Sequence, residues 1–255
     1  MNLFDLTGKI AVVTGGNGGI GLGIAEGLAQ AGARVAVIGR NPEKTAQAAA
    51  KIASGAGGET LAVTADVSRP DQVERLVSEV IGRFGAIDIL VNNAGITVRK
   101  MPQDMTVEDW HAVMGVNVTG AFLMAKAAYP ALKAAGGGKI LNIGSLASTF
   151  GASYAVGYSA SKGAIVQLTK SLALAWAPDN IQVNAILPGW FDTDMTERAR
   201  AEVAGLNERV LSRTPQKRWA RPSDMAGTAV WLTSAASDFV TGVAVPVDGG
   251  YSIAP

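Results

Sequence analysis

Short runs of mostly apolar residues alternate with longer stretches of helical periodicity along the whole chain. Runs of this kind are typical of strands buried on both faces of a sheet. Between them, apolar residues recur at intervals of three and four, as in helices that cover a sheet with one face. The runs predict seven strands, at Ile10–Thr14, Arg34–Ile38, Thr60–Thr64, Ile87–Asn92, Lys139–Gly144, Ile181–Leu187 and Val243–Val247.

This alternation predicts an α/β fold with a Rossmann-like, doubly wound parallel sheet of seven strands. No linker and no shift in composition divides the 255 residues. We therefore expect a single dinucleotide-binding catalytic domain over residues 1–255. A hydrophobic content of 48% is enough to build its core.

Composition excludes several classes of function. A net charge of +1 gives no electrostatic case for binding nucleic acid or an anionic membrane. The chain has no cysteine and only one histidine, His111, which argues against a metal site and against a Ser-His-Asp triad. The N-terminus does not resemble a signal peptide, and no apolar run approaches the ~18 residues of a membrane span. We therefore expect a cytoplasmic protein.

A glycine-rich loop follows the first predicted strand and leads directly into a helix. It reads Thr-Gly-Gly-Asn-Gly-Gly-Ile-Gly over residues 14–21. Glycines let the backbone approach a pyrophosphate, and the helix N-terminus offers N–H groups and a positive dipole to it. The loop therefore indicates a dinucleotide site, with the spacing Thr-Gly-x-x-x-Gly-x-Gly.

Three side chains can carry acid–base chemistry together. Ser145 follows the fifth predicted strand, and Tyr158 and Lys162 lie one turn apart on the next helix. An ammonium beside a phenol is expected to lower the tyrosine pKa from ~10, so that the tyrosine exchanges a proton near neutral pH. A second pair of the same spacing, Tyr129 and Lys133, has no hydroxyl at a strand end before it, and we interpret it as structural.

The glycine loop and the Tyr-x-x-x-Lys pair together resemble the short-chain dehydrogenases/reductases. The resemblance covers nearly the whole chain. Its further motifs, in order, are Asp66-Val67, Asn92-Asn93-Ala94-Gly95, Asn117, Pro188-Gly189, Thr241-Gly242 and Val247-Asp248-Gly249-Gly250.

The resemblance implies a role for each catalytic residue. Tyr158 is expected to be the general acid/base, and Lys162 to lower its pKa and hold the nicotinamide ribose. Ser145 is expected to orient the substrate oxygen. Asn117 is expected to break a helix and hold a water of the proton relay.

The resemblance also implies a set of cofactor contacts. The glycine loop is expected to hold the pyrophosphate, and the ends of the later strands the adenine and the nicotinamide. The expected contacts are Gly15, Asn17, Gly18, Gly19, Ile20, Gly21, Arg40, Asn41, Asp66, Val67, Asn93, Ala94, Gly95, Tyr158, Lys162, Pro188, Gly189 and Thr193.

The end of the second predicted strand indicates which dinucleotide is used. NAD-preferring relatives usually have a carboxylate where this chain has Gly39, and here Arg40 follows, which can pair with a 2′-phosphate. Many NADP-preferring relatives carry a second base in the glycine loop, where this chain has Gly18. We predict NADP, with NAD as a weaker alternative.

Residues from about 190 to 215 have weak apolar periodicity and lie where the family places a mobile lid over the substrate. The lid acids Asp192 and Asp194 have no histidine nearby, so a polar hinge explains them better than a metal site. Four aromatic residues are expected at the pocket mouth, namely Phe150, Tyr154, Trp190 and Phe191.

The resulting prediction is an oxidoreductase that transfers a hydride between NADP(H) and a secondary alcohol or ketone. By analogy the small-molecule substrate is a sugar, a sugar acid or a cyclic alcohol. A 3-oxoacyl thioester reductase shares every motif and stays open, as does a non-catalytic dinucleotide-binding regulator. Helical stretches 113–132 and 157–176 are apolar on more than one face, which, with the family resemblance, predicts a homotetramer; residues 247–255 are expected near a second interface.

Overall fold

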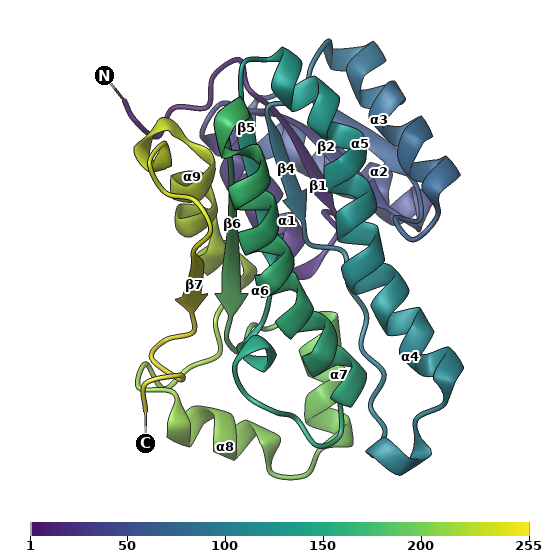
Figure 1. Ribbon diagram of the computed structural model, residues 1–255. Helices are drawn as coiled ribbons and strands as arrows, with labels where there is room; N and C mark the ends of the chain where they lie inside the picture. The colour runs from purple at the N-terminus through teal and green to yellow at the C-terminus, as the bar shows by residue number, and fades with distance from the viewer. Residues whose placement is uncertain (1, 255) are drawn as a thin grey trace.

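A seven-stranded sheet runs through the computed structural model, which describes residues 2–254 (Figure 1). All neighbouring strands are parallel, in the order β3-β2-β1-β4-β5-β6-β7. This confirms the predicted Rossmann-like fold. The strands are β1 (Ile10–Thr14), β2 (Arg34–Gly39), β3 (Thr60–Thr64), β4 (Ile89–Asn92), β5 (Gly138–Ile143), β6 (Ile181–Pro188) and β7 (Ala244–Val247).

Helices cover both faces of the sheet (Figure 1). α3, α5 and α6 pack against one face, and α1, α2 and α9 against the other. The helices are α1 (Gly19–Gln30), α2 (Pro42–Ala56), α3 (Pro70–Phe84), α4 (Val107–Met114), α5 (Gly120–Ala134), α6 (Val156–Trp176), α7 (Asp194–Glu202), α8 (Leu206–Arg213) and α9 (Ala226–Thr233).

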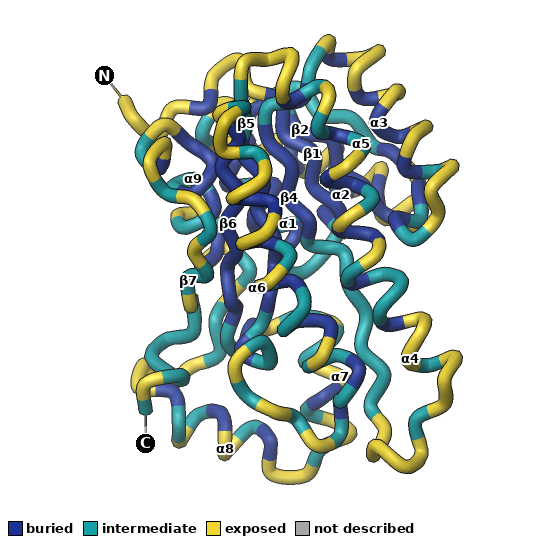
Figure 2. The backbone as a smooth tube through the Cα atoms, in the orientation of Figure 1, coloured by how far each residue is buried: buried dark blue, intermediate teal, exposed yellow. Residues whose placement is uncertain are grey.

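The strands are buried on both sides because successive side chains point to opposite faces. In β1, Val12 joins the core beneath α3, α5 and α6, whereas Val13 joins the core beneath α1, α2 and α9. Figure 2 shows the inner strands as the continuous buried centre of the molecule, while the edge strands β3 and β7 are partly exposed. Full burial of each such valine contributes roughly 1.5–3 kcal/mol, which fixes the register of the sheet.

β4 begins two residues later than the sequence pattern predicts. Ile87 is fully buried, but the paired stretch of β4 starts at Ile89. Asp88 lies between them, and its carboxylate accepts hydrogen bonds from the backbone N–H of Ile10 at 2.9 Å and from Nζ of Lys9 at 3.0 Å. The side chain of Asp88 therefore binds the first residue of β1, at the point where the pattern predicted that β4 had already begun.

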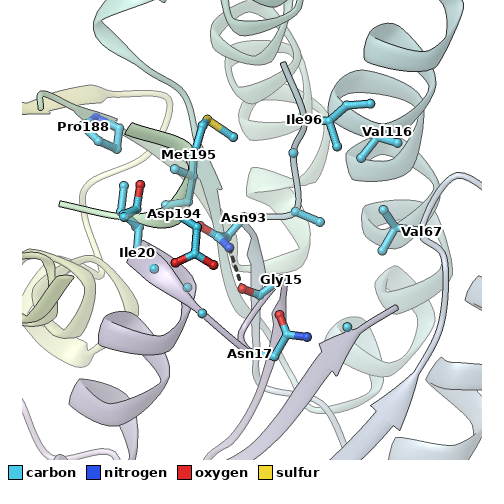
Figure 3. Close-up of a pocket in the computed structure, with 18 of the residues that line it drawn as sticks. Gly15, Asn17, Ile20, Val67, Asn93, Ile96, Val116, Pro188, Asp194 and Met195 are labelled. Carbon is cyan, nitrogen blue, oxygen red and sulfur yellow. Dashed lines mark hydrogen bonds between the residues drawn. The ribbon is translucent and has the colours of Figure 1, made fainter. Parts of the chain in front are cut away.

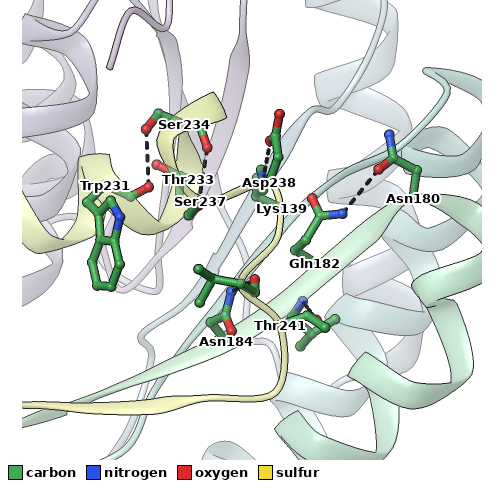
Figure 4. Close-up of polar contacts among 12 residues, drawn as sticks. Lys139, Asn180, Gln182, Asn184, Trp231, Thr233, Ser234, Ser237, Asp238 and Thr241 are labelled. Carbon is green, nitrogen blue, oxygen red and sulfur yellow. Dashed lines mark hydrogen bonds and ion pairs between the residues drawn. The ribbon is translucent and has the colours of Figure 1, made fainter. Parts of the chain in front are cut away.

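Polar side chains secure the edge strand β7 against β6 (Figure 4). Asn184 donates to the carbonyl of Val240 at 2.8 Å and accepts from the N–H of Val243 at 3.2 Å. Thr241 accepts from the N–H of Val183 at 3.1 Å. These partly buried bonds satisfy backbone groups of Val183, Val240 and Val243, and so hold the segment before β7 against β6.

α4, a π-helical turn at Gly115–Thr119 and α5 form one helical run of 28 residues, Val107–Ala134. Its length and hydropathy alone would also suit a membrane span. In the fold, Met124, Ala125 and Leu132 of this run are at most 1% exposed and belong to the core against the sheet.

The segment predicted as a lid forms α7 and α8, beyond the carboxyl ends of the strands (Figure 1). Ala199, Leu206 and Val210 make a small core of their own, against which Trp190 and Trp219 pack. The weak periodicity of this segment reflects two helices of nine and eight residues that bury only a few side chains each.

Candidate active site

A cavity of about 370 Å³ opens at the carboxyl ends of the strands, where the order of the strands reverses between β1 and β4 (Figure 3). Parallel α/β sheets bind ligands at such a switch point. The predicted residues that line it are Gly15, Asn17, Gly18, Gly19, Ile20, Gly21, Arg40, Asp66, Val67, Asn93, Ala94, Gly95, Ser145, Tyr158, Lys162, Pro188, Gly189 and Thr193.

The glycine loop turns too tightly for side chains at two of its positions. Gly15 has φ of 62°, in the left-handed region. A Cβ on Gly21 would lie 2.2 Å from the carbonyl oxygen of Gly15. The loop therefore presents bare backbone, with the N-terminus of α1 behind it, to the cavity.

β4 holds this loop in place through Asn93. The side-chain amide of Asn93 donates to the carbonyl oxygens of Thr14 at 3.0 Å and Gly15 at 3.1 Å; the second bond is drawn in Figure 3. In return, Oγ1 of Thr14 accepts from the backbone N–H groups of Asn93 at 3.0 Å and Ala94 at 3.1 Å. The predicted contact residue Asn93 thus acts on the loop directly.

Ser145, Tyr158 and Lys162 meet at the other end of the cavity. Lys162 is 5% exposed, and its Nζ donates to the carbonyl of Ile143 at 2.7 Å and lies 5.6 Å from the ring centroid of Tyr158. The hydroxyl of Ser148 donates to the carbonyl of Lys162 at 2.7 Å and accepts from the N–H of Ser145 at 3.2 Å. One hydroxyl therefore links the strand end that bears the serine to the helix that bears the lysine.

Burial dominates the acid–base properties of this group. It raises the pKa of Tyr158 above 10.0, while a hydrogen bond with Ser145 and the charge of Arg99 act in the opposite direction. It lowers the pKa of Lys162 from 10.5 to about 8. The pKa of Tyr158 is therefore raised where the sequence predicted a lowering, because burial of the phenol itself outweighs the groups that oppose it.

Asn117 lies in the π-helical turn between α4 and α5, so the α-helical pattern changes at the residue where the sequence predicted a break, although the helical run continues. Its amide exchanges two hydrogen bonds with the backbone of Ile96, at 2.8 and 3.0 Å, and donates to the hydroxyl of Ser161 at 2.9 Å. The side chain is buried and does not line the cavity. It instead fixes the loop after β4 against α6.

The end of β2 suits a cofactor that carries a 2′-phosphate. Gly39 and Arg40 both line the cavity. A Cβ on Gly39 would lie 2.2 Å from Nδ2 of Asn17 and 2.5 Å from Oγ1 of Thr45, so a carboxylate at this position would displace its neighbours. Burial alone would raise the pKa of Asp66, but hydrogen bonds from Ser68, with the charges of Arg40 and Arg69, hold it below its usual value.

Asn41 does not line the cavity, contrary to the prediction. Its side chain accepts the N–H of Lys44 at 2.9 Å and caps the N-terminus of α2, with Pro42 at the first helical position. An Asn-Pro pair before a helical pattern is a capping signal that the sequence already contained.

Sequence reasoning missed two cations beside the cavity. Lys44 lines it, and its Nζ lies 3.0 Å from Oδ2 of Asp194 on α7. Arg99, after β4, donates to Oε2 of Glu202 and to the carbonyl of Met195, both at 2.9 Å. Lys44 carried a signal, because a base in the first turn of a helix opposes the helix dipole; Arg99 carried none beyond its position after a strand.

The aromatic pocket mouth is only partly as predicted. Phe191 lines the cavity, but Phe150 and Tyr154 do not. The guanidinium of Arg213 lies 5.2 Å from the ring centroid of Phe150 and 4.6 Å from that of Tyr251. Trp190 packs edge-on against Trp219. Phe150 and Trp190 therefore contact the lid rather than line this cavity.

The second Tyr-x-x-x-Lys pair lies outside the cavity. Tyr129 donates to Asp179 at 2.7 Å and stacks on Trp176 at a centroid distance of 4.8 Å. Lys133 pairs with the same carboxylate at 2.8 Å. This pair joins α5 to the segment after α6, which agrees with its structural interpretation.

Potential metal ligands do not converge in the part of the chain from residue 2 to 254: no group of three His, Asp or Glu side chains could hold an ion. The two acids of the lid are both ion-paired, Asp192 with Arg200 and Asp194 with Lys44. His111 is exposed on α4, away from the cavity lining.

Comparison with known proteins agrees with this geometry. The family described as Enoyl-(Acyl carrier protein) reductase matches residues 15–252. A 2-dehydro-3-deoxy-D-gluconate 5-dehydrogenase of Escherichia coli is 40% identical over 252 residues, 98% of each chain. A 3-oxoacyl-[acyl-carrier-protein] reductase of Synechocystis is 38% identical, over 96% of this chain and 97% of that protein.

A solved structure is similar over the whole length. The gluconate 5-dehydrogenase from Burkholderia cenocepacia, in complex with NADP and tartrate, has a TM-score of 0.94 and 41% identity, and covers 100% of this chain and 99% of its own. The chain belongs to the short-chain dehydrogenase/reductase family. It is an NAD(P)-dependent oxidoreductase that acts on CH–OH groups, which confirms the predicted family and reaction class.

Proposed function

We propose that the protein interconverts a secondary hydroxyl and a ketone on a sugar acid, with NADP as its cofactor. The observation that carries the choice of an acid is Arg99. Its charge acts on Tyr158, and its guanidinium bonds Met195, which lines the cavity. A guanidinium beside the reacting end of a cavity is suited to bind a carboxylate in bidentate fashion.

The named relatives support the same substrate class. The similar protein of Escherichia coli is named for a deoxy sugar acid, and the Burkholderia structure contains tartrate, a hydroxy dicarboxylate. In this chain Glu202 on α7 now pairs with Arg99. A substrate carboxylate would take over that guanidinium from Glu202.

The catalytic residues divide the work as follows. NADP, when bound, accepts the hydride in oxidation and supplies it in reduction. Tyr158 takes the proton of the substrate hydroxyl in oxidation and returns it in reduction, while Ser145 hydrogen-bonds the same substrate oxygen. Lys162 holds the tyrosine and the ribose, and Asn117 fixes the loop that closes this end of the site.

The cofactor is expected to lie along the residues of the cavity. Gly15, Asn17, Gly18, Gly19, Ile20 and Gly21 would hold the pyrophosphate, and Asp66, Val67, Asn93, Ala94 and Gly95 would flank the adenosine and its ribose. Pro188, Gly189 and Thr193 would bound the nicotinamide. Arg40 would bind the 2′-phosphate.

Replacing Arg99 by Gln is expected to lower kcat/KM for gluconate by about 10- to 100-fold, because one charge-assisted hydrogen bond to the carboxylate is lost. The same variant should change kcat/KM for glucose, which lacks the carboxylate, by less than about twofold. Lys100→Gln is the matched control, because Lys100 is exposed and pairs with Asp109 on α4. An equal loss with gluconate and glucose would show that Arg99 only holds the lid.

A 3-oxoacyl thioester reductase is the second candidate, supported by the Synechocystis relative. It predicts turnover of an acetoacetyl thioester with NADPH that Arg99→Gln leaves unchanged. Rates with the thioester and with a keto sugar acid, measured side by side, distinguish the two candidates.

We further propose a cytoplasmic homotetramer that binds neither nucleic acid nor membrane. The large apolar side chains that are exposed include residues of α5, of α6 and of the C-terminal part of the chain. Phe122 of α5 is 44% exposed and Leu174 of α6 is 82% exposed, while Phe239 and Ile253 lie exposed toward the C-terminal end of the chain. Faces of this kind suit two self-complementary interfaces.

Light scattering of the purified protein at micromolar concentration is expected to give the mass of four chains. Leu174→Glu should shift the mass to that of a smaller assembly, because it places a charge in the α6 interface. Ser54→Glu, at an exposed serine of α2 outside the proposed interfaces, is the control for added charge. A monomeric mass for the unmodified protein would contradict this proposal.

A further inference from the structure

An ion pair crosses the cavity between the nucleotide side and the lid. Lys44 is the third residue of α2, and Asp194 is the first residue of α7. Their charged atoms lie 3.0 Å apart, and both residues line the cavity. Figure 3 draws Asp194 together with Gly15 and Ile20 of the glycine loop, among the residues that line the cavity.

The ammonium of Lys44 lies over Gly18 of the glycine loop. A Cβ on Gly18 would lie 3.1 Å from Nζ of Lys44. The absence of a side chain at Gly18 therefore leaves room for a cation that α2 supplies. Lys44 thus reaches the cavity from α2, whose preceding loop contributes Arg40.

The present partner of Lys44 holds it weakly. The side chains of Lys44 and Asp194 are 49% and 76% exposed. Exposed pairs of this kind contribute little, because water and salt screen them and both side chains lose entropy. A phosphate dianion that met Lys44 and Arg40 together would compete well with a single carboxylate.

We propose that Lys44 is a second 2′-phosphate-binding residue, and that Asp194 occupies its ammonium only until NADP binds. The inference rests on the proposed use of NADP. Cofactor binding then transfers Lys44 from the lid to the phosphate and removes one of the two ion pairs that tie α7 to the body. The other, Arg99–Glu202, remains at the substrate end.

Dissociation constants for NADPH and NADH, measured by titration calorimetry without substrate, test this proposal. Lys44→Gln is expected to raise the dissociation constant of NADPH about tenfold, as for the loss of one charge-assisted hydrogen bond, and that of NADH by less than about twofold. Asp194→Asn is expected to tighten NADPH about two- to fivefold, because a competing surface ion pair is removed. In the double variant the Asp194 change should have no effect on NADPH.

Lys51→Gln is the matched control, since Lys51 lies on the same helix and pairs with Glu26 on α1. It should leave both affinities unchanged. Equal weakening of NADPH and NADH by Lys44→Gln would overturn the proposal, as would unchanged or weaker NADPH binding by Asp194→Asn. A preference of the unmodified protein for NADH would instead refute the NADP assignment itself, so the two failures are distinguishable.

Discussion

Replacing Tyr158 by Phe is expected to lower kcat by about 10²- to 10⁴-fold, the usual contribution of a general acid/base. The dissociation constant for NADPH should stay within about twofold, because the change removes one hydroxyl and leaves the ring that packs at the cavity wall. Steady-state kinetics and calorimetry on one preparation measure both quantities.

Tyr129→Phe is the matched control for this experiment. It removes the hydroxyl that bonds Asp179, outside the cavity, so kcat should be unchanged. Stability should fall by about 1 kcal/mol at most, as for one hydrogen bond. Loss of turnover in Tyr129→Phe with turnover retained in Tyr158→Phe would show that the wrong pair has been assigned.

Lys162→Met is expected to impair both catalysis and the binding of NADPH. kcat should fall by about 10²-fold or more, because the tyrosine loses its cationic neighbour. The affinity for NADPH should fall about tenfold, because the ribose loses a charged donor. Unchanged NADPH binding would show that Lys162 serves the tyrosine alone.

Burial of Lys162 is also expected to make the free energy of unfolding depend on pH. The pKa of Lys162 is about 8 in the fold and 10.5 as a free side chain, so between these values the unfolded chain binds the extra proton. The free energy of unfolding of the native protein, relative to Lys162→Met, should therefore rise as the pH increases through this window. Urea denaturation of both proteins at neutral and at alkaline pH gives the difference; a flat difference would mean that Lys162 stays solvated.

The sheet could be predicted from the sequence because burial on both faces leaves an unmistakable apolar pattern. The start of β4 and the end of β6 could not be predicted. At the start of β4, the side chain of Asp88 takes the place of a backbone acceptor for the N–H of Ile10. At the end of β6, Pro188 still pairs with Val247 of β7. Such exchanges depend on which strand lies alongside, which periodicity does not encode.

The cavity could be predicted where the backbone forms it, and less well where long side chains do. Gly15 and Asn93 lie at strand ends that any parallel sheet brings together. Lys44 and Arg99 enter the site only because α7 folds back over it and supplies Asp194 and Glu202 as partners. Each of these two side chains is oriented by a carboxylate that lies more than a hundred residues away along the chain.

The tyrosine pKa shows the same limit. The spacing of Tyr158 and Lys162 correctly places them on one face of α6. It does not reveal that Lys162 is buried and Tyr158 half-buried, or that the ammonium bonds the carbonyl of Ile143 at 2.7 Å. Desolvation therefore outweighs the effect expected from the lysine charge, and Ser145 and Arg99 are the groups that oppose it.

The direct test of the proposed reductase activity is the rate at which the purified protein oxidises NADPH in the presence of a keto sugar acid, followed by the loss of NADPH absorbance. The account predicts rapid consumption with NADPH, slower consumption with NADH, and a loss of about 10²-fold or more in Tyr158→Phe. If NADPH binds but no ketone causes its oxidation, in the native protein as in Tyr158→Phe, the protein is not this enzyme, and a dinucleotide-binding regulator is favoured.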